Sequence, residues 1–144
     1  MVTSNPKINV GSYAKIYGEF FENITEDKIE SLNILCAKDM FFRDPFNSFT
    51  GLDKFKKVFQ HMYKQASNPK FFISDICTIN NTAYMKWNFS SGKFVEIEGI
   101  SEIKFNEDGL VTSHVDYWDS ASQIFAKIPI IKYLIRYLIK KLSI

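Results

Sequence analysis

The chain has 144 residues, a length that fits one domain with at most a short extension. Hydrophobic residues make up 46% and aromatic residues 16%, which excludes a disordered or low-complexity chain. Five basic residues and no acidic residue follow Asp119, which leaves 13 basic and 16 acidic residues, a charge of −3, on the preceding part. The net negative charge of residues 1–119 argues against nucleic-acid binding by this part. Only the basic tail after Asp119 is expected to attract anionic partners.

Cysteine and histidine usage gives little support for metal chemistry. Cys36 and Cys77 lie in apolar stretches without CxxC spacing, and we expect both thiols to be buried. His61 and His114 are the only histidines, too few for a clustered zinc site. We therefore expect neither a metal ion nor an organic cofactor.

The sequence contains no targeting or membrane-spanning pattern. Its first residues lack the apolar core of a signal peptide. No apolar run reaches the roughly 18 residues that a spanning helix needs. The expectation is a cytoplasmic protein.

The first third of the chain has helical periodicity. Apolar residues recur three or four positions apart from Val10 to Phe21, and Asn9 or Ser12 can cap this helix. A second helix opens at Thr25, with acidic residues in its first turn. Its predicted inner face consists of Ile29, Leu32, Leu35 and Cys36.

A short strand and a third helix follow. Met40–Asp44 is rich in aromatic residues, and Pro45, which lacks an N–H, ends this predicted strand. The stretch PFNSFTG is a predicted loop. The third helix begins after Gly51 and ends before Asn68-Pro69.

From residue 70 the apolar period changes to two, which is typical of strands. Runs beginning near Phe71, Ala83, Val95 and Leu110 are separated by short turns, so they form a four-stranded meander. One face of the first run holds Phe71, Ile73, Cys77 and Ile79. Gly99, inside the third run, indicates a bulge or a tight bend.

This order of elements, helices first and strands later, predicts the α+β class. A strongly curved antiparallel sheet with three helices on its concave face would enclose a conical cavity. We assign residues 1–120 to this domain and residues 121–144 to a basic, amphipathic helical segment.

Asp44, His114 and Asp116 are the candidate catalytic residues. A carboxylate at Asp44 in an apolar cavity wall suits proton transfer; the alternative is an Asp that bonds its own loop. His114 and Asp116 lie two apart on one strand and project from the same face. They form either a proton-handling dyad or a buried polar pair that satisfies neighbouring groups.

Aromatic residues and one hydroxyl are the candidate ligand-binding groups. Stripes at helical or strand spacing pack a core, line a pocket, or do both, because pockets are mostly apolar with a few polar groups. The predicted lining is Tyr13, Tyr17, Phe20, Phe42, Trp87, Ser101 and Trp118.

The C-terminal segment has an aliphatic face and a basic face. Lys132, Arg136 and Lys140 stand four residues apart. This pattern fits a helix on a membrane surface, a clasp that packs on the domain or on a second subunit, or a core helix with a solvated lysine stripe.

The segments FRDPF, FNEDG and HVDYWD, with Gly51 opening a helix, resemble the nuclear transport factor 2-like superfamily, in particular its SnoaL-like, ketosteroid isomerase-like branch. HVDYWDSASQIFAKIP is similar to a bacterial subgroup of that branch. The resemblance covers most of residues 8–120 and implies a cone-shaped fold, which hosts isomerases, cyclases, epoxide hydrolases and binding modules. It also implies a homodimer paired through the convex sheet face, where Tyr84, Lys86 and Asn88 are expected.

Ketosteroid isomerase has an Asp before Pro as its general base, and Asp44 matches that position. Its two oxyanion donors correspond to Phe20 and Ser101, with Tyr17 one turn before Phe20, so steroid isomerisation is not expected. Trp118 matches the Trp of the family's last strand, which supports an inward-facing position.

We therefore expect a pocket for a small, mainly apolar molecule. One hypothesis is a cofactor-independent isomerase, cyclase or hydrolase that works by general acid–base catalysis. The other is a non-catalytic ligand-binding or dimeric assembly domain, with membrane-peripheral attachment through residues 121–144 as a further alternative. The sequence does not decide whether the domain is an enzyme.

Overall fold

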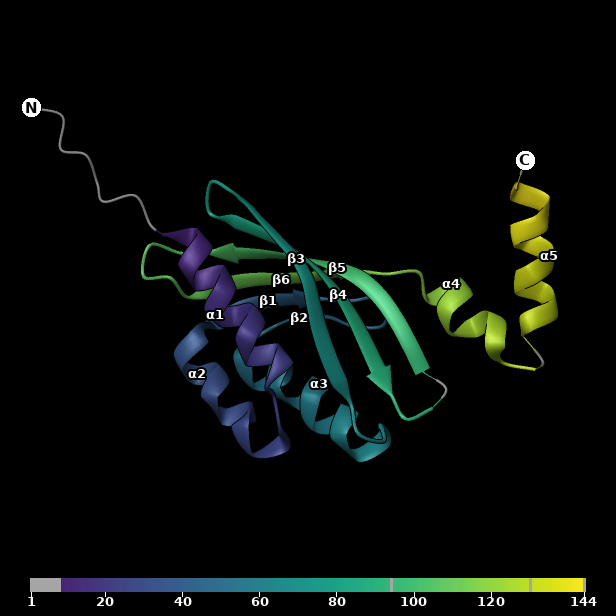
Figure 1. Cartoon of the computed structure of the whole chain (residues 1–144), viewed down its shortest axis with the longest axis horizontal. Helices are drawn as coiled ribbons and strands as arrows, with labels where there is room; N and C mark the ends of the chain where they lie inside the picture. The colour runs from purple at the N-terminus through teal and green to yellow at the C-terminus, as the bar shows by residue number, and fades with distance from the viewer. Residues whose placement is uncertain (1–8, 94, 130, 144) are drawn as a thin grey trace, which may run out of the picture.

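The computed structural model describes residues 9–93, 95–129 and 131–143 (Figure 1). The helical elements are α1 (Val10–Glu22), the 3-10 helix η1 (Glu26–Ser31), α2 (Leu32–Leu35), α3 (Leu52–Gln65), α4 (Ser120–Gln123), η2 (Phe125–Lys127) and α5 (Lys132–Leu142). The strands are β1 (Cys36–Arg43), β2 (Ser48–Thr50), β3 (Lys70–Ile79), β4 (Thr82–Ser91), β5 (Val95–Phe105) and β6 (Val111–Tyr117).

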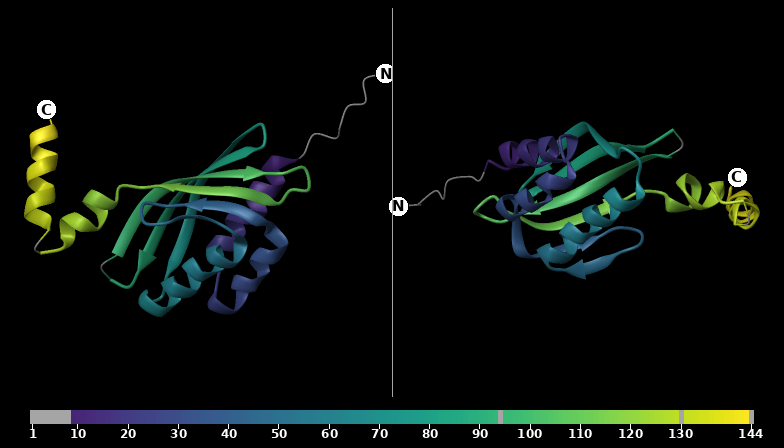
Figure 2. Two further views of the ribbon diagram at one scale, coloured as in Figure 1. Left: turned by 180° about the vertical axis from the view of Figure 1, so that it is seen from behind. Right: turned by 90° about the horizontal axis from the view of Figure 1, so that it is seen from below.

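The six strands form one curved sheet in the order β2-β1-β6-β5-β4-β3, with α1, α2 and α3 on one face (Figure 2). The α+β class with a mainly antiparallel, cone-shaped sheet is confirmed. One pair, β1 with β6, is parallel, because the last strand returns beside the first after the long excursion through α3 and the meander. The three-residue strand β2 was expected to be loop; it pairs with β1 across the turn that Pro45 opens.

The first helix begins where its capping signal places it. The Asn9 side chain accepts the Ser12 N–H at 3.1 Å and caps α1, whose buried stripe includes Ala14, Tyr17 and Phe21. The second predicted helix is instead the 3-10 turn η1 followed by one turn of α2. It ends at Leu35, so Cys36 already belongs to β1, four residues before the predicted strand start.

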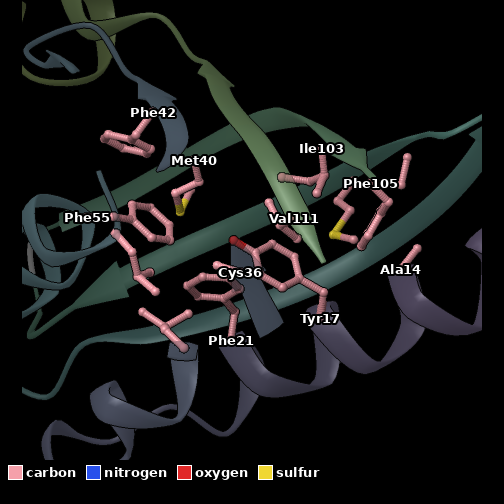
Figure 3. Packing of buried hydrophobic residues seen from close by; sticks show 14 of the residues in the cluster. Ala14, Tyr17, Phe21, Cys36, Met40, Phe42, Phe55, Ile103, Phe105 and Val111 are labelled. Atoms are coloured by element: carbon pink, nitrogen blue, oxygen red, sulfur yellow. The ribbon is translucent and has the colours of Figure 1, made fainter. Parts of the chain in front are cut away.

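A single apolar core fills the space between the helices and the concave face (Figure 3). Leu32, Met40, Phe55 and Ile103 are fully buried there. α1 packs mainly on β3, and α3 packs mainly on β1, so the two longer helices cover opposite ends of the same face of the sheet. The side chains between these helices and the sheet include many aromatic rings, and a cavity remains among them.

A register shift between Ile73 and Asp75 changes the face of the second half of β3. Ile76 is therefore paired with Met85 on the concave side, while Cys77 pairs with Tyr84 on the convex side. The expectation that Cys77 shares a face with Ile73 and is buried is wrong: its thiol is exposed, whereas Cys36 is buried as predicted. A bulge adds one residue, and simple alternation cannot detect it.

The C-terminal segment leaves the domain after β6. α4 is capped by Asp119, whose carboxylate accepts the Ser122 N–H at 3.1 Å. α5 stands apart from the sheet and the N-terminal helices in every view (Figures 1 and 2). Among the described residues, no helix has the length and apolar character needed to cross a bilayer.

Two neighbouring residues of α2 test the packing of the helical layer. Replacing the fully buried Leu32 with Ala removes apolar contacts and leaves a cavity, so we expect a loss of about 2–5 kcal/mol of unfolding free energy. The matched control is Ile34→Ala in the same turn, where the side chain is 76% exposed; it should change stability by less than about 0.5 kcal/mol. Urea unfolding of both variants measures the difference, and equal losses would contradict this packing.

Candidate functional site

A cavity of about 240 Å³ lies between the helices and the concave face of the sheet. Its walls are mainly apolar, and α1, α3 and five strands contribute to them. Its volume lies below the range of about 300–1,000 Å³ typical of pockets for drug-sized ligands, so it suits a small molecule. The polar residues that line it are Tyr17, Asp44, Ser101, His114 and Asp116.

His114 occupies the centre of the aromatic layer. Its imidazole is 6% exposed and lies against the edges or faces of Phe21, Phe42 and Phe55, with ring centroids 5.3–5.9 Å apart. Both ring nitrogens are hydrogen bonded: Nδ1 to the Tyr17 hydroxyl at 2.9 Å and Nε2 to Asp116 Oδ1 at 2.8 Å. The ring is therefore fixed by packing and by two polar contacts.

These contacts define the proton positions when Asp116 is ionised. In the neutral imidazole one nitrogen carries a proton; because a carboxylate oxygen only accepts, that nitrogen is Nε2, which donates a hydrogen bond to Asp116 and leaves Nδ1 as an acceptor. The Tyr17 hydroxyl then donates to Nδ1. Burial raises the pKa of Tyr17 well above its usual value, with nearby Cys36 and Asp116 adding to the effect, so this hydroxyl keeps its proton.

Asp116 is held from a second side by Ser101. The Ser101 hydroxyl donates to the same Oδ1 atom, and the Trp87 indole N–H donates to Ser101 Oγ at 2.8 Å. Within the part of the chain that the structure describes, no hydrogen bond reaches Oδ2 of Asp116. Oδ2 is therefore the oxygen of this cavity-lining carboxylate that keeps its acceptor capacity free.

The Trp87 ring needs a glycine opposite it. A Cβ atom at Gly99 would lie 2.5 Å from Trp87 Cζ2 and 2.7 Å from Cη2. The pairing of β4 with β5 runs through Gly99 without a register shift, so the bulge, one of the two irregularities expected there, is absent from this pairing. The glycine instead gives the indole room to cross the strand and reach Ser101.

Asp44 lines the cavity, but its carboxylate is engaged by its own loop. Oδ1 accepts the backbone N–H groups of Phe46 at 2.7 Å and Asn47 at 2.6 Å. The Asn47 amide nitrogen lies 3.1 Å from both carboxylate oxygens. These contacts match the alternative interpretation of Asp44, in which it fixes the turn at Pro45.

The structure brings together most of the residues singled out in the sequence. Tyr17, Phe42, Trp87, Ser101 and Trp118 line the same cavity as Asp44, His114 and Asp116. Tyr13 and Phe20 do not line it: Tyr13 lies over Gly109 and stacks on Phe105, and Phe20 packs on the Phe21 ring. Both belong to the same amphipathic helix as Tyr17, but only part of the apolar stripe of this helix faces the cavity.

Other lining residues were not predicted. Phe21, Met62, Met85 and Ile97 contribute to the wall. Met85 lies two positions before Trp87, on the same strand face, and Phe21 follows Tyr17 by four positions, on the same helix face. The strand and helix periodicities of the sequence could therefore have predicted both as lining residues.

Cys36 is linked to the site by a hydrogen bond with Tyr17. Burial raises the pKa of the Cys36 thiol to about 12, and the hydrogen bond with Tyr17 only partly opposes this effect. The thiol is therefore protonated near neutral pH and is not a nucleophile. Among the residues that the structure describes, no three His, Cys, Asp or Glu side chains are grouped as a metal site.

The fold and the site together define a class of protein. A cone-shaped sheet with a polar cluster in an apolar cavity is the architecture of nuclear transport factor 2-like proteins. The family model for the SnoaL-like domain matches residues 17–114, so the chain belongs to the SnoaL-like family. No curated protein matches the sequence of this chain.

Solved structures with the same fold differ in their described activities. An LEH-like epoxide hydrolase from M. tuberculosis has 13% identity and a TM-score of 0.65, with 94% of this chain and 97% of that chain covered. A steroid delta-isomerase from Pseudomonas aeruginosa has 16% identity and a TM-score of 0.64, covering 98% and 100%. An NTF2-like protein of unknown function from Cytophaga hutchinsonii has 13% identity and a TM-score of 0.63, covering 83% and 97%. At these identities the likeness shows the fold alone.

Gly99→Ala tests the link between the backbone and the polar cluster. The new methyl group must displace the Trp87 ring, so we expect loss of its hydrogen bond to Ser101 and about 1–3 kcal/mol of destabilisation. Tryptophan fluorescence should shift to longer wavelength as the indole becomes wetter. Glu98→Ala, next to it on the exposed face, is the control and should leave the spectrum unchanged.

Proposed function

We propose that this protein binds a small, mainly apolar molecule in the cavity and acts on it by cofactor-independent general acid–base chemistry. The observation that carries the proposal is the buried hydrogen-bond chain from Tyr17 through His114 to Asp116, with one carboxylate oxygen left free. In this scheme Asp116 Oδ2 takes a proton from the ligand or from a water molecule beside it.

The other members of the chain are positioning residues. His114 and Ser101 both donate to Oδ1, so they stabilise the ionised carboxylate and leave Oδ2 without a partner among the described residues. Tyr17 fixes the imidazole tautomer through Nδ1. When Asp116 takes up a proton, the hydrogen-bonded Oδ1 stays in place and the proton resides on Oδ2.

Three donors of the described cavity lining are not free to stabilise a developing oxyanion. The Tyr17, Ser101 and Trp87 donors are all used within the chain, and removal of oxyanion donors costs about 10²–10³ in rate in enzymes that depend on them. This favours water activation over enolisation among acid–base reactions. It also favours the second candidate function, a binding module that holds its ligand without turnover.

Asp116→Asn tests the catalytic role. The amide keeps the shape of the carboxylate but cannot accept a proton, so we expect turnover to fall by about 10²–10⁴ while ligand retention persists. The assay is hydrolysis of small apolar epoxides and esters, with native mass spectrometry of the purified protein reporting any retained molecule. Asp44→Asn is the matched control, because its carboxylate serves the loop; it should lower stability more than turnover.

The results separate the two candidates. Turnover that survives in Asp116→Asn but not in Asp44→Asn would transfer the base role to Asp44. A retained molecule with no turnover in the unsubstituted protein supports the binding module.

We also propose that two copies pair through the convex face of the sheet. Phe72, Ile79, Ile100 and Tyr117 are 45–62% exposed there, so this face offers apolar side chains for pairing. Ile100→Glu, at the middle of β5, places a charge among these side chains and should convert dimer to monomer in sedimentation velocity. Ile16→Glu on α1, where the side chain is 51% exposed, is the control and should leave the dimer intact. A monomer before substitution would overturn this pairing.

A further inference from the structure

The C-terminal helix α5 presents an aliphatic face that the described part of the chain does not cover. None of its side chains is buried, and its main neighbour is the short turn η2 (Figures 1 and 2). Leu134 is 60%, Leu138 44% and Leu142 85% exposed. An isolated helix of 11 residues is marginal in water, so this helix gains stability when its apolar face finds a partner.

The arrangement of residues around α5 is that of an interfacial helix. At about 100° per residue, the leucines and isoleucines cover an arc of roughly 140°. Lys132 and Lys141 flank this arc on its two sides, and Arg136 and Lys140 lie on the opposite face. Basic side chains at the borders of an apolar arc can reach lipid head groups while the arc enters the acyl region.

Charge identifies the partner. Five basic residues and no acidic residue follow Asp119, and Asp119 itself is used as the cap of α4. Two such tails packed face to face would bring like charges together, which disfavours a tail-to-tail dimer. An anionic bilayer complements both the apolar arc and the positive charge.

The start of the tail is fixed to the domain beside the cavity. The Gln123 side chain makes two hydrogen bonds to the Glu98 backbone, at 2.7 and 3.0 Å. Phe125 packs on Phe46, and Phe46 packs on the cavity residue Trp118, with centroid distances of 5.9 and 5.5 Å. A surface bound by α5 therefore lies at the Trp118 end of the domain.

We propose that α5 binds an anionic lipid bilayer at its surface, with its leucine and isoleucine arc in the acyl region and the flanking Lys132 and Lys141 at the head groups. With 11 residues, the helix is about half the length needed to span a bilayer, so it lies along the interface. This binding does not depend on turnover in the cavity.

Vesicle flotation of the full chain tests the proposal. The protein should float with phosphatidylcholine vesicles that contain phosphatidylglycerol, bind weakly to phosphatidylcholine alone, and dissociate as salt screens the charges. Replacing Lys132 and Lys141 with Gln removes the two charges that flank the arc, and we expect about a thirty-fold lower partition coefficient. Leu134→Glu with Leu138→Glu should abolish flotation.

A control variant and three contrary outcomes complete the test. Ile34→Glu on α2, at a side chain that is 76% exposed, should float like the unsubstituted chain. Equal binding to neutral and anionic vesicles, or flotation that survives both leucine substitutions, overturns the proposal. So does a protein that does not float but changes from dimer to monomer when Leu134 and Leu138 are replaced, because a second copy is then the partner.

Discussion

The hydrogen bond between His114 Nε2 and Asp116 Oδ1 is the contact on which the arrangement of the site depends. It joins two residues that a strand places on one face, and it directs one carboxylate oxygen inward to the polar cluster and leaves the other free. A buried carboxylate without such donors would be costly in this apolar layer. The aromatic rings around His114 in turn keep the imidazole from rotating. Because these rings come from α1, β1 and α3, the packing of the helices on the sheet determines the orientation of this one imidazole.

The same contact explains why a polar cluster is tolerated inside a hydrophobic core. Every buried side-chain nitrogen and oxygen among the described residues has a hydrogen-bond partner. Satisfied networks of this kind are rigid, because displacing one member leaves its neighbours unpaired in a low dielectric. Trp87 and Tyr17 occupy the two ends of the network, where a large apolar ring carries one polar atom inward.

Much of the site could be predicted from the spacing of apolar and polar residues along the sequence. Period-two alternation placed His114, Asp116 and Trp118 on one face of a strand, and helical spacing placed Tyr17 on the inner stripe of α1. What could not be predicted depends on tertiary contacts. The bulge in β3, the end of the second helix before Cys36, and the role of Gly99 as space for Trp87 are set by neighbours far away in the sequence. The hydrogen-bond partners of Asp44 lie within its own turn, yet the sequence supports a loop role and a cavity role equally well.

The bulge has a further effect because β3 is the outer strand of the sheet. A ten-residue border with exposed Phe72 and Ile79 is the kind of template on which identical chains add strand after strand. The register shift breaks the even spacing of its outward amides, and the Glu22 carboxylate already accepts the Ile73 N–H at 2.9 Å. The irregularity that moves Cys77 outward is thus also one of the devices by which natural sheets discourage pairing along an exposed edge strand.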